Sequence, residues 1–215
     1  MKKILLASLI SAVWLTGCSE KEKNKLVSPV VLALQEDVSA LHKQFHGKYK
    51  VISSVSNEAV DIDLDGVSSR NMLLELTELN AAARTKYGVE IRIYGPSAHN
   101  PKPRYIFTQW WPEQYIRTGP GTVWNGGDPL EYNPDYLVKY DFQGAIRGFT
   151  FATDLKRLFI TPDKEENRFR WVRPESVTVD EAGRIIVAIR KHLYTRAGVK
   201  EVTITTTYER YTTAT

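Results

Sequence analysis

The sequence of 215 residues contains one cysteine, Cys18. A single cysteine forms no disulfide within its own chain and supplies no zinc site built from several thiolates. A folded domain in this chain must therefore be held together by its core rather than by covalent cross-links. The sequence also has no internal repeat and no low-complexity tract, so we expect one domain rather than an array of repeats.

Catalytic motifs are missing as well. There is no G-x-S-x-G nucleophile elbow and no glycine-rich phosphate loop after a strand. Among the four histidines, His42 and His46 are four residues apart on one predicted helix face, but no third metal ligand accompanies them. We interpret these histidines as surface residues. The absences favour a protein that is not an enzyme.

The charge is nearly balanced. The full sequence has 29 basic and 25 acidic residues, and removal of Lys2 and Lys3 with a signal segment leaves 27 basic residues against 25 acidic ones. A net charge of +2 does not provide the basic surface that nucleic-acid binding requires. We therefore expect no nucleic-acid partner.

The N-terminus has the composition of a secretion signal. Lys2 and Lys3 precede an apolar run from Ile4 to Leu15, which is too short to span a bilayer. The run ends in Leu-Thr-Gly-Cys at Cys18, which is similar to the lipobox of bacterial lipoproteins. The alternative is an ordinary cleaved signal followed by a chance cysteine.

The lipobox similarity implies a division of the chain into three parts. These are a signal peptide at residues 1–17, the lipidated Cys18 with a flexible tether at residues 18–28, and a single domain at residues 29–215. It also implies two acyl chains on the Cys18 sulfur and a third on the new N-terminus, which together anchor a protein firmly to a membrane. A lipid-modified sulfur cannot act as a catalytic thiolate.

Hydrophobic periodicity predicts two helices and many strands. We expect one helix from Pro29 to Phe45 and another from about Ser69 to Ala83. One strand precedes the second helix, and from Val89 onward about nine alternating runs are separated by turn residues. Short connections favour antiparallel neighbours. The predicted fold class is mainly β: an antiparallel meander that closes into a β-barrel, with an N-terminal helix and one short inserted helix.

Residues 47–76 carry a family resemblance. Gly-Lys-Tyr begins a strand, Asp-Ile-Asp-Leu-Asp-Gly follows it, and a helical pattern comes next. Together with the C-terminal hairpin pattern of residues 183–211, this resembles the lipocalin-like lipoproteins of Bacteroides-type bacteria. The resemblance implies a lipocalin-like barrel, lipid-anchored in the envelope of a Gram-negative bacterium at the outer membrane. It implies no common ligand.

The aspartate-rich stretch resembles the first half of an EF-hand loop. Ca²⁺ takes six to eight oxygen ligands, and such loops supply them at alternate positions around a sharp glycine turn. Met72 stands where an EF-hand has its bidentate glutamate. Two interpretations remain open: a solvated turn that caps the next helix, or a structural Ca²⁺ site. The candidate ligands are Asp61, Asp63, Asp65, Val67 through its carbonyl, Ser69 and Glu75.

The segment from Trp110 to Tyr136 is rich in aromatic residues, glycine and proline. We interpret it as a long irregular loop, and such loops are often functional. Aromatic faces at a barrel mouth can hold a small apolar or glycan-like ligand. The candidate ligand-binding residues are Trp110, Trp111, Tyr115, Trp124 and Tyr132. In the alternative interpretation, Trp110 and Trp111 lie on opposite faces of a strand and one of them fills the barrel.

Three functional hypotheses follow. The first is a non-enzymatic binding module for a small apolar or glycan-like ligand. The second is a structural or protein-interaction lipoprotein whose barrel is filled. The third is a hydrolase whose site the sequence does not reveal. An open cavity lined by the tryptophans favours the first hypothesis, and a packed interior favours the second.

Overall fold

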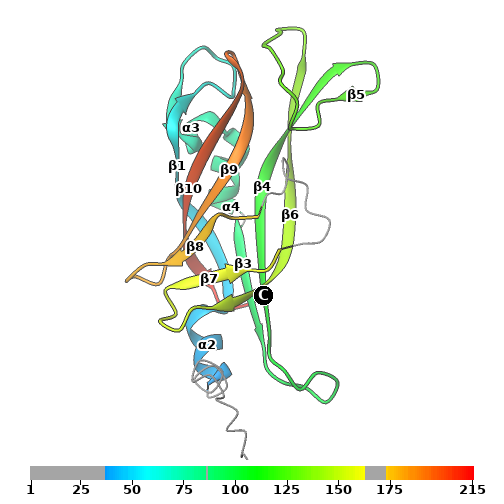
Figure 1. Cartoon of the computed structure of the whole chain (residues 1–215). Helices are drawn as coiled ribbons and strands as arrows, with labels where there is room; N and C mark the ends of the chain where they lie inside the picture. The colour runs from blue at the N-terminus through cyan, green and yellow to red at the C-terminus, as the bar shows by residue number, and fades with distance from the viewer. Residues whose placement is uncertain (1–36, 86, 163–172) are drawn as a thin grey trace, which may run out of the picture.

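The computed structural model describes residues 37–85, 87–162 and 173–215. The predicted signal peptide, Cys18, the tether and the helix residues 29–36 lie outside the described residues. Eight antiparallel strands form a closed ring in chain order, which confirms the predicted barrel (Figure 1). The strands of the ring are β1 (Gly47–Val60), β3 (Val89–Tyr94), β4 (Arg104–Gly119), β6 (Leu137–Phe151), β7 (Arg157–Ile160), β8 (Ser176–Val179), β9 (Ile185–Thr195) and β10 (Gly198–Thr212).

Pairing between the first and last strands closes the ring. β10 pairs with β1 from Thr212 opposite Lys48 to Ile204 opposite Ser56. The buried hydroxyls of Ser54 and Thr206 share a hydrogen bond of 2.8 Å across this pair. Two short strands lie outside the ring: β2 (Ser69–Asn71) pairs with β1, and β5 (Thr122–Val123) pairs with β4.

Helix α2 (Val38–Phe45) covers one end of the barrel, at the bottom of Figure 1. The Asp37 side chain caps it by accepting a hydrogen bond from the Ala40 N–H at 2.7 Å. Phe45 is 1 % exposed, and its ring lies 4.7 Å from that of Phe151 in β6. The apolar stripe of this helix is thus part of the barrel core, as its spacing predicts.

The inserted helix begins later than predicted and is divided into two. Residues predicted to start it form β2, and α3 (Met72–Glu75) and α4 (Thr77–Thr85) follow. Asn71 caps α3 by accepting the Leu73 N–H at 3.1 Å. Leu76 has an extended backbone conformation, which ends α3, although its buried side chain continues the apolar stripe. None of the helices in the described residues is long and apolar enough to cross a membrane.

β4 and β6 are longer than the sequence predicts. They pair continuously from Ile106 opposite Gly148 to Arg117 opposite Leu137. The first part of the aromatic segment is therefore a strand rather than an irregular loop. β3 pairs with β4 only as far as Gln109, so Pro112 lies where β4 has one strand neighbour, a position that tolerates proline.

The side chains inside the ring form the main core. The buried members from its strands include Tyr49, Val51, Val89, Ile91, Phe107, Trp111, Phe149, Phe151, Leu158, Val177, Ile185, Val187, Ile189, Val202, Ile204 and Tyr208. A second, smaller core lies beyond the main one and contains Ile116, Trp124 and Tyr194. It joins the far ends of β4 and β9.

Candidate functional site

The aspartate loop follows the last residue of β1. One carboxylate oxygen from each of Asp61, Asp63 and Asp65 lies within 4.8 Å of the other two. The side chain of Asp61 is only 7 % exposed, whereas Asp63 and Asp65 are exposed. The structure therefore brings together the three aspartates that the spacing predicts to converge.

Backbone N–H groups orient these carboxylates. Gly66 N–H donates to Asp61 Oδ2 at 2.9 Å, and Val67 N–H donates to Asp65 Oδ1 at 2.7 Å. Gly66 has a φ of 95°, which a glycine adopts without strain. Arg196, in the turn between β9 and β10, places its Nε 3.4 Å from Asp61 Oδ2 and 2.8 Å from the Leu64 carbonyl oxygen.

Asp61 uses its two oxygens unequally. Oδ2 accepts the Gly66 N–H and lies in an ion pair with Arg196, whereas Oδ1 is fully buried and has no hydrogen-bond partner in the structure. A buried carboxylate oxygen without a partner is rare, because burial removes its hydration. This orphaned oxygen belongs to the same residue that contributes the buried member of the aspartate group.

Glu75 lies beside the loop. It is 4 % exposed, and its Oε2 accepts the Ile62 N–H at 3.0 Å. Burial raises the pKa of Glu75 above its usual value, and the charges of Asp63 and Asp61 raise it further. Burial, followed by the charges of Asp65 and Asp61, likewise raises the pKa of Asp63.

The other predicted ligands take different positions. The Ser69 hydroxyl accepts the Asn71 N–H at 3.0 Å, so it orients the start of α3. The Val67 side chain is 67 % exposed, and only its carbonyl is a candidate ligand. Met72, at the position of the missing glutamate, is completely buried in the core, which explains why an acidic residue is absent there.

Of the aromatic candidates, Trp111 and Trp124 line one small cavity of about 10 Å³, and the other three do not line it. Trp111 is 4 % exposed inside the barrel, and Trp124 is 6 % exposed in the second core, where its Nε1 donates to the Asp128 carbonyl oxygen at 2.7 Å. Tyr132 stacks on Tyr194 with ring centres 6.2 Å apart. These three rings fill cores, whereas the sequence alone left open whether they bind a ligand.

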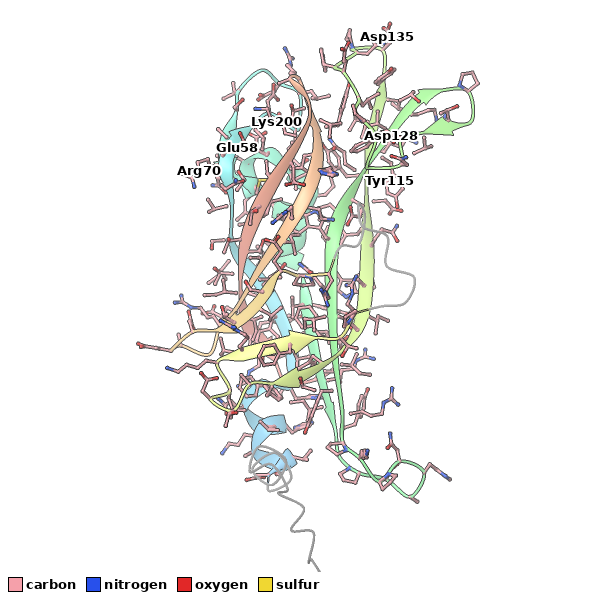
Figure 2. All side chains as sticks on the ribbon, viewed as in Figure 1. Glu58, Arg70, Tyr115, Asp128, Asp135 and Lys200 are labelled. Atoms are coloured by element: carbon pink, nitrogen blue, oxygen red, sulfur yellow. The ribbon has the colours of Figure 1, made fainter. Side chains whose placement is uncertain are left out.

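Trp110 and Tyr115 are half-buried on β4. The Trp110 ring covers Gly144 of β6 so closely that a Cβ on this glycine would lie 2.7 Å from a ring carbon. Tyr115 lies opposite Lys139 on the ribbon of β4 and β6 (Figure 2). Because adjacent residues of a strand point to opposite faces, Trp110 lies on the other face from Trp111. This is the alternative interpretation of the sequence, in which the two tryptophans lie on opposite faces of a strand and one of them fills the barrel.

The barrel interior contains a buried ion pair that the sequence did not reveal. Lys191 Nζ of β9 contacts Glu113 Oε1 of β4, and the two side chains are 3 % and 6 % exposed. The cavities that Trp111 helps to line have volumes of about 10 Å³, which is room for roughly one water molecule. The signal in the sequence was a charged residue two positions from Trp111, on the same face of the strand.

A side-chain amide joins β4 to β9 near the second core. Gln114 accepts the Tyr194 N–H at 2.8 Å and donates to the Tyr194 carbonyl at 2.9 Å, as a neighbouring strand would do. The Tyr194 hydroxyl accepts the Asn133 N–H at 2.8 Å. Tyr140 of β6 donates its hydroxyl hydrogen to the Ile62 carbonyl in the aspartate loop. The aspartate loop and the aromatic segment are therefore parts of one connected end of the molecule.

His46 is not a surface residue, contrary to the sequence interpretation. It is 7 % exposed, and its Nδ1 accepts the Ile93 N–H at 3.0 Å. Its ring stacks on that of His42 with centres 3.9 Å apart. Burial, followed by the positive charge of His42, lowers the pKa of His46. A hydrogen-bond acceptor at the end of α2 explains this histidine without a metal.

One larger hollow, of about 440 Å³, is lined by residues 157–160 and 173–177. It contains none of the predicted site residues. In the comparisons with known proteins, no family model, no curated protein and no solved structure matches this chain.

Proposed function

We propose that this protein is a non-enzymatic lipoprotein of a bacterial envelope that acts through its outer surface, as a structural or protein-interaction module. Its anchor is the lipid on Cys18, and its membrane is the outer membrane of a Gram-negative bacterium. A bound small molecule inside the barrel is not part of this function.

Close packing around Trp111, in the described part of the barrel, is the observation that carries the proposal. Pockets for small molecules usually have volumes of about 300–1,000 Å³, whereas the cavities beside Trp111 have about 10 Å³. Trp111 and the Glu113–Lys191 ion pair are buried at this place. Entry of a ligand would separate two buried charges, which is strongly unfavourable.

One end of the barrel carries α2, and the other end carries the aspartate loop (Figure 1). α2 is the described element nearest to Cys18 in the sequence, and Figure 1 shows it at the end opposite β5 and the aspartate loop. An anchor on Cys18 therefore leaves the aspartate loop and the tip of β4 and β6 at the end far from α2. Val123 and Leu137, both opposite Arg117, are 49 % and 48 % exposed at this tip, where a protein partner has access to them.

Titration with an apolar fluorescent probe, 1-anilinonaphthalene-8-sulfonate, tests the filled interior. The wild-type chain, purified in detergent, is expected to give no saturable signal above that of the detergent. Trp111→Ala should create a cavity and bind the probe, whereas Trp110→Ala, which alters the outer face, should not. Saturable, stoichiometric binding by the wild type would overturn the proposal.

The anchor is tested separately in cells. Metabolic labelling with a palmitate analogue should mark the wild-type chain and not the Cys18→Ser variant. Labelling of both chains to the same extent would exclude Cys18 as the lipidated residue. The filled interior would be unaffected by that result.

A further inference from the structure

We infer that the aspartate loop is a calcium site in which Asp61, Asp63 and Asp65 are ligands and Glu75 is the fourth carboxylate at its edge. This inference does not rest on the proposed function, because either a filled or a hollow barrel can carry a metal on this loop. It depends on three independent observations of the loop.

The first observation is the separation of the carboxylate oxygens. Two ligands on opposite sides of one ion are separated by at most twice the metal–ligand distance. For Ca²⁺ at 2.3–2.6 Å this limit is about 5 Å, and for Mg²⁺ at 2.0–2.1 Å it is about 4 Å. The three aspartate oxygens lie within 4.8 Å of one another, so no pair of them exceeds the limit for Ca²⁺.

The second observation is the orphaned oxygen of Asp61. Asp61 is 6 % exposed, and its Oδ1 has no hydrogen-bond donor. Its Oδ2, in contrast, accepts the Gly66 N–H and lies 3.4 Å from Arg196 Nε. The same carboxylate thus has one oxygen held by the backbone and one left for a further positive group. A cation among the three aspartates supplies the missing partner.

The third observation is the local excess of negative charge. Four carboxylates lie close together at the loop: Asp61, Asp63, Asp65 and Glu75. In the described residues, Arg196 forms an ion pair with this group, through Asp61. Like charges this close repel unless a cation neutralises them. The donors are all oxygens, which favours a hard cation such as Ca²⁺ over zinc.

The loop is also connected to the rest of the barrel end. Tyr140 of β6 donates to the Ile62 carbonyl, and Arg196 of the β9–β10 turn donates to the Leu64 carbonyl. Both carbonyls belong to residues between the aspartates. An ion that fixes the loop therefore also fixes the contacts of β6 and β9 with it, and calcium should raise the stability of the whole domain.

Calorimetric titration of the full chain in detergent, after removal of Ca²⁺ with EGTA, tests the site. We expect one Ca²⁺ per chain with a Kd of about 1 mM or lower. Mg²⁺ should bind at least about 10-fold more weakly, given the spacing of the oxygens. At a 100-fold excess of Ca²⁺ over Kd, Tm should rise by about 5 °C or more.

Three isosteric variants make the test specific. Asp63→Asn, at an exposed position, should weaken Ca²⁺ binding at least about 10-fold while Tm in EGTA stays within a few degrees of the wild-type value. Asp61→Asn should weaken binding as much, but it also alters the acceptor of Gly66 N–H. Asp135→Asn is the matched control, because Asp135 is an exposed aspartate at the same end (Figure 2).

The inference fails if wild-type protein gives neither binding heat nor a rise in Tm with Ca²⁺. It also fails if Asp63→Asn and Asp135→Asn bind Ca²⁺ as tightly as the wild type. Neither result would affect the probe titration or the lipid labelling, so loss of the calcium site and loss of the proposed function are distinguishable.

Discussion

The ion pair between Glu113 and Lys191 should be the most sensitive polar contact in the barrel. Replacement of Lys191 by Met keeps the aliphatic stem and leaves the Glu113 carboxylate, which is 6 % exposed, without its cation. Removal of one partner from a buried pair destabilises a protein by about 3–5 kcal/mol. For a domain of this size, that corresponds to a fall in Tm of about 6–20 °C.

Urea denaturation of four chains measures the effect as a double-mutant cycle. These are the wild type, Lys191→Met, Glu113→Gln and the double variant. Since the double variant leaves no charge at positions 113 and 191, it should be more stable than the sum of the single effects by about 2 kcal/mol or more. The slope of the unfolding free energy with urea should stay constant if only the native contact changes.

An exposed pair provides the control. Lys200 Nζ lies 3.9 Å from Glu58 Oε2, with side chains 37 % and 47 % exposed (Figure 2). Lys200→Met should change stability by less than about 1 kcal/mol, because water screens this pair. If Lys191→Met costs no more than Lys200→Met, or if the cycle is additive, the Glu113–Lys191 pair does not hold the barrel together.

Two further predictions concern the packing of the strands. Gly144→Ala should destabilise the folded chain by about 1–3 kcal/mol, because the new Cβ would lie 2.7 Å from the Trp110 ring. Gly119→Ala is the control. It should change stability by less than about 0.5 kcal/mol, because no atom lies within 4 Å of its new Cβ. Urea denaturation of both variants measures the difference, and equal values would contradict the close contact. Burial raises the pKa of Tyr208 from 10.0 to about 12, so the folded chain holds the phenol proton more tightly than the unfolded chain does. The folded chain therefore loses stability between about pH 10 and pH 12, by about 1.4 kcal/mol per pH unit for this residue. Tyr208→Phe should make the loss measured between these pH values shallower, and an unchanged slope would show that Tyr208 does not titrate as a buried group.

The strands were predictable from the sequence because alternation is a local signal. In β9, Ile185, Val187 and Ile189 point into the core and the residues between them do not. Once such runs are joined by short turns, antiparallel neighbours follow. Closure follows in turn, because a long meander otherwise leaves two open edges.

The length of β4 was not predictable in the same way. Pro112 and the glycines after it are local signals for a loop. The strand persists because β6 pairs with it from Ile106 to Arg117, and that pairing depends on residues about 30 positions away. The inserted helix was misjudged for a related reason: Ser69 is a good cap by propensity, but it is paired with Val60 of β1.

Of the candidate sites, the sequence predicts those that depend on local spacing and not those that depend on distant residues. The convergence of Asp61, Asp63 and Asp65 follows from spacing within five residues, and the structure brings them together. The burial of Trp111 and Glu113 depends instead on β9, the strand that faces them inside the barrel. Lys191 is 78 residues from Glu113 in the chain, and no local pattern in the sequence links the two.

Closure of the ring by β1 and β10 underlies the close packing around Trp111, the buried ion pair and the position of the aspartate loop. Ser54 and Thr206 lie opposite each other across this closure, with hydroxyls 2.8 Å apart, which is a spacing that suits a disulfide. In a Cys18→Ser chain, Ser54→Cys with Thr206→Cys should cross-link almost completely on mild oxidation, measured as a mobility shift on a non-reducing gel. Ser54→Cys with Thr150→Cys, on the non-adjacent strand β6, should not cross-link. Absence of the first cross-link, or equal formation of both, would contradict a closed barrel.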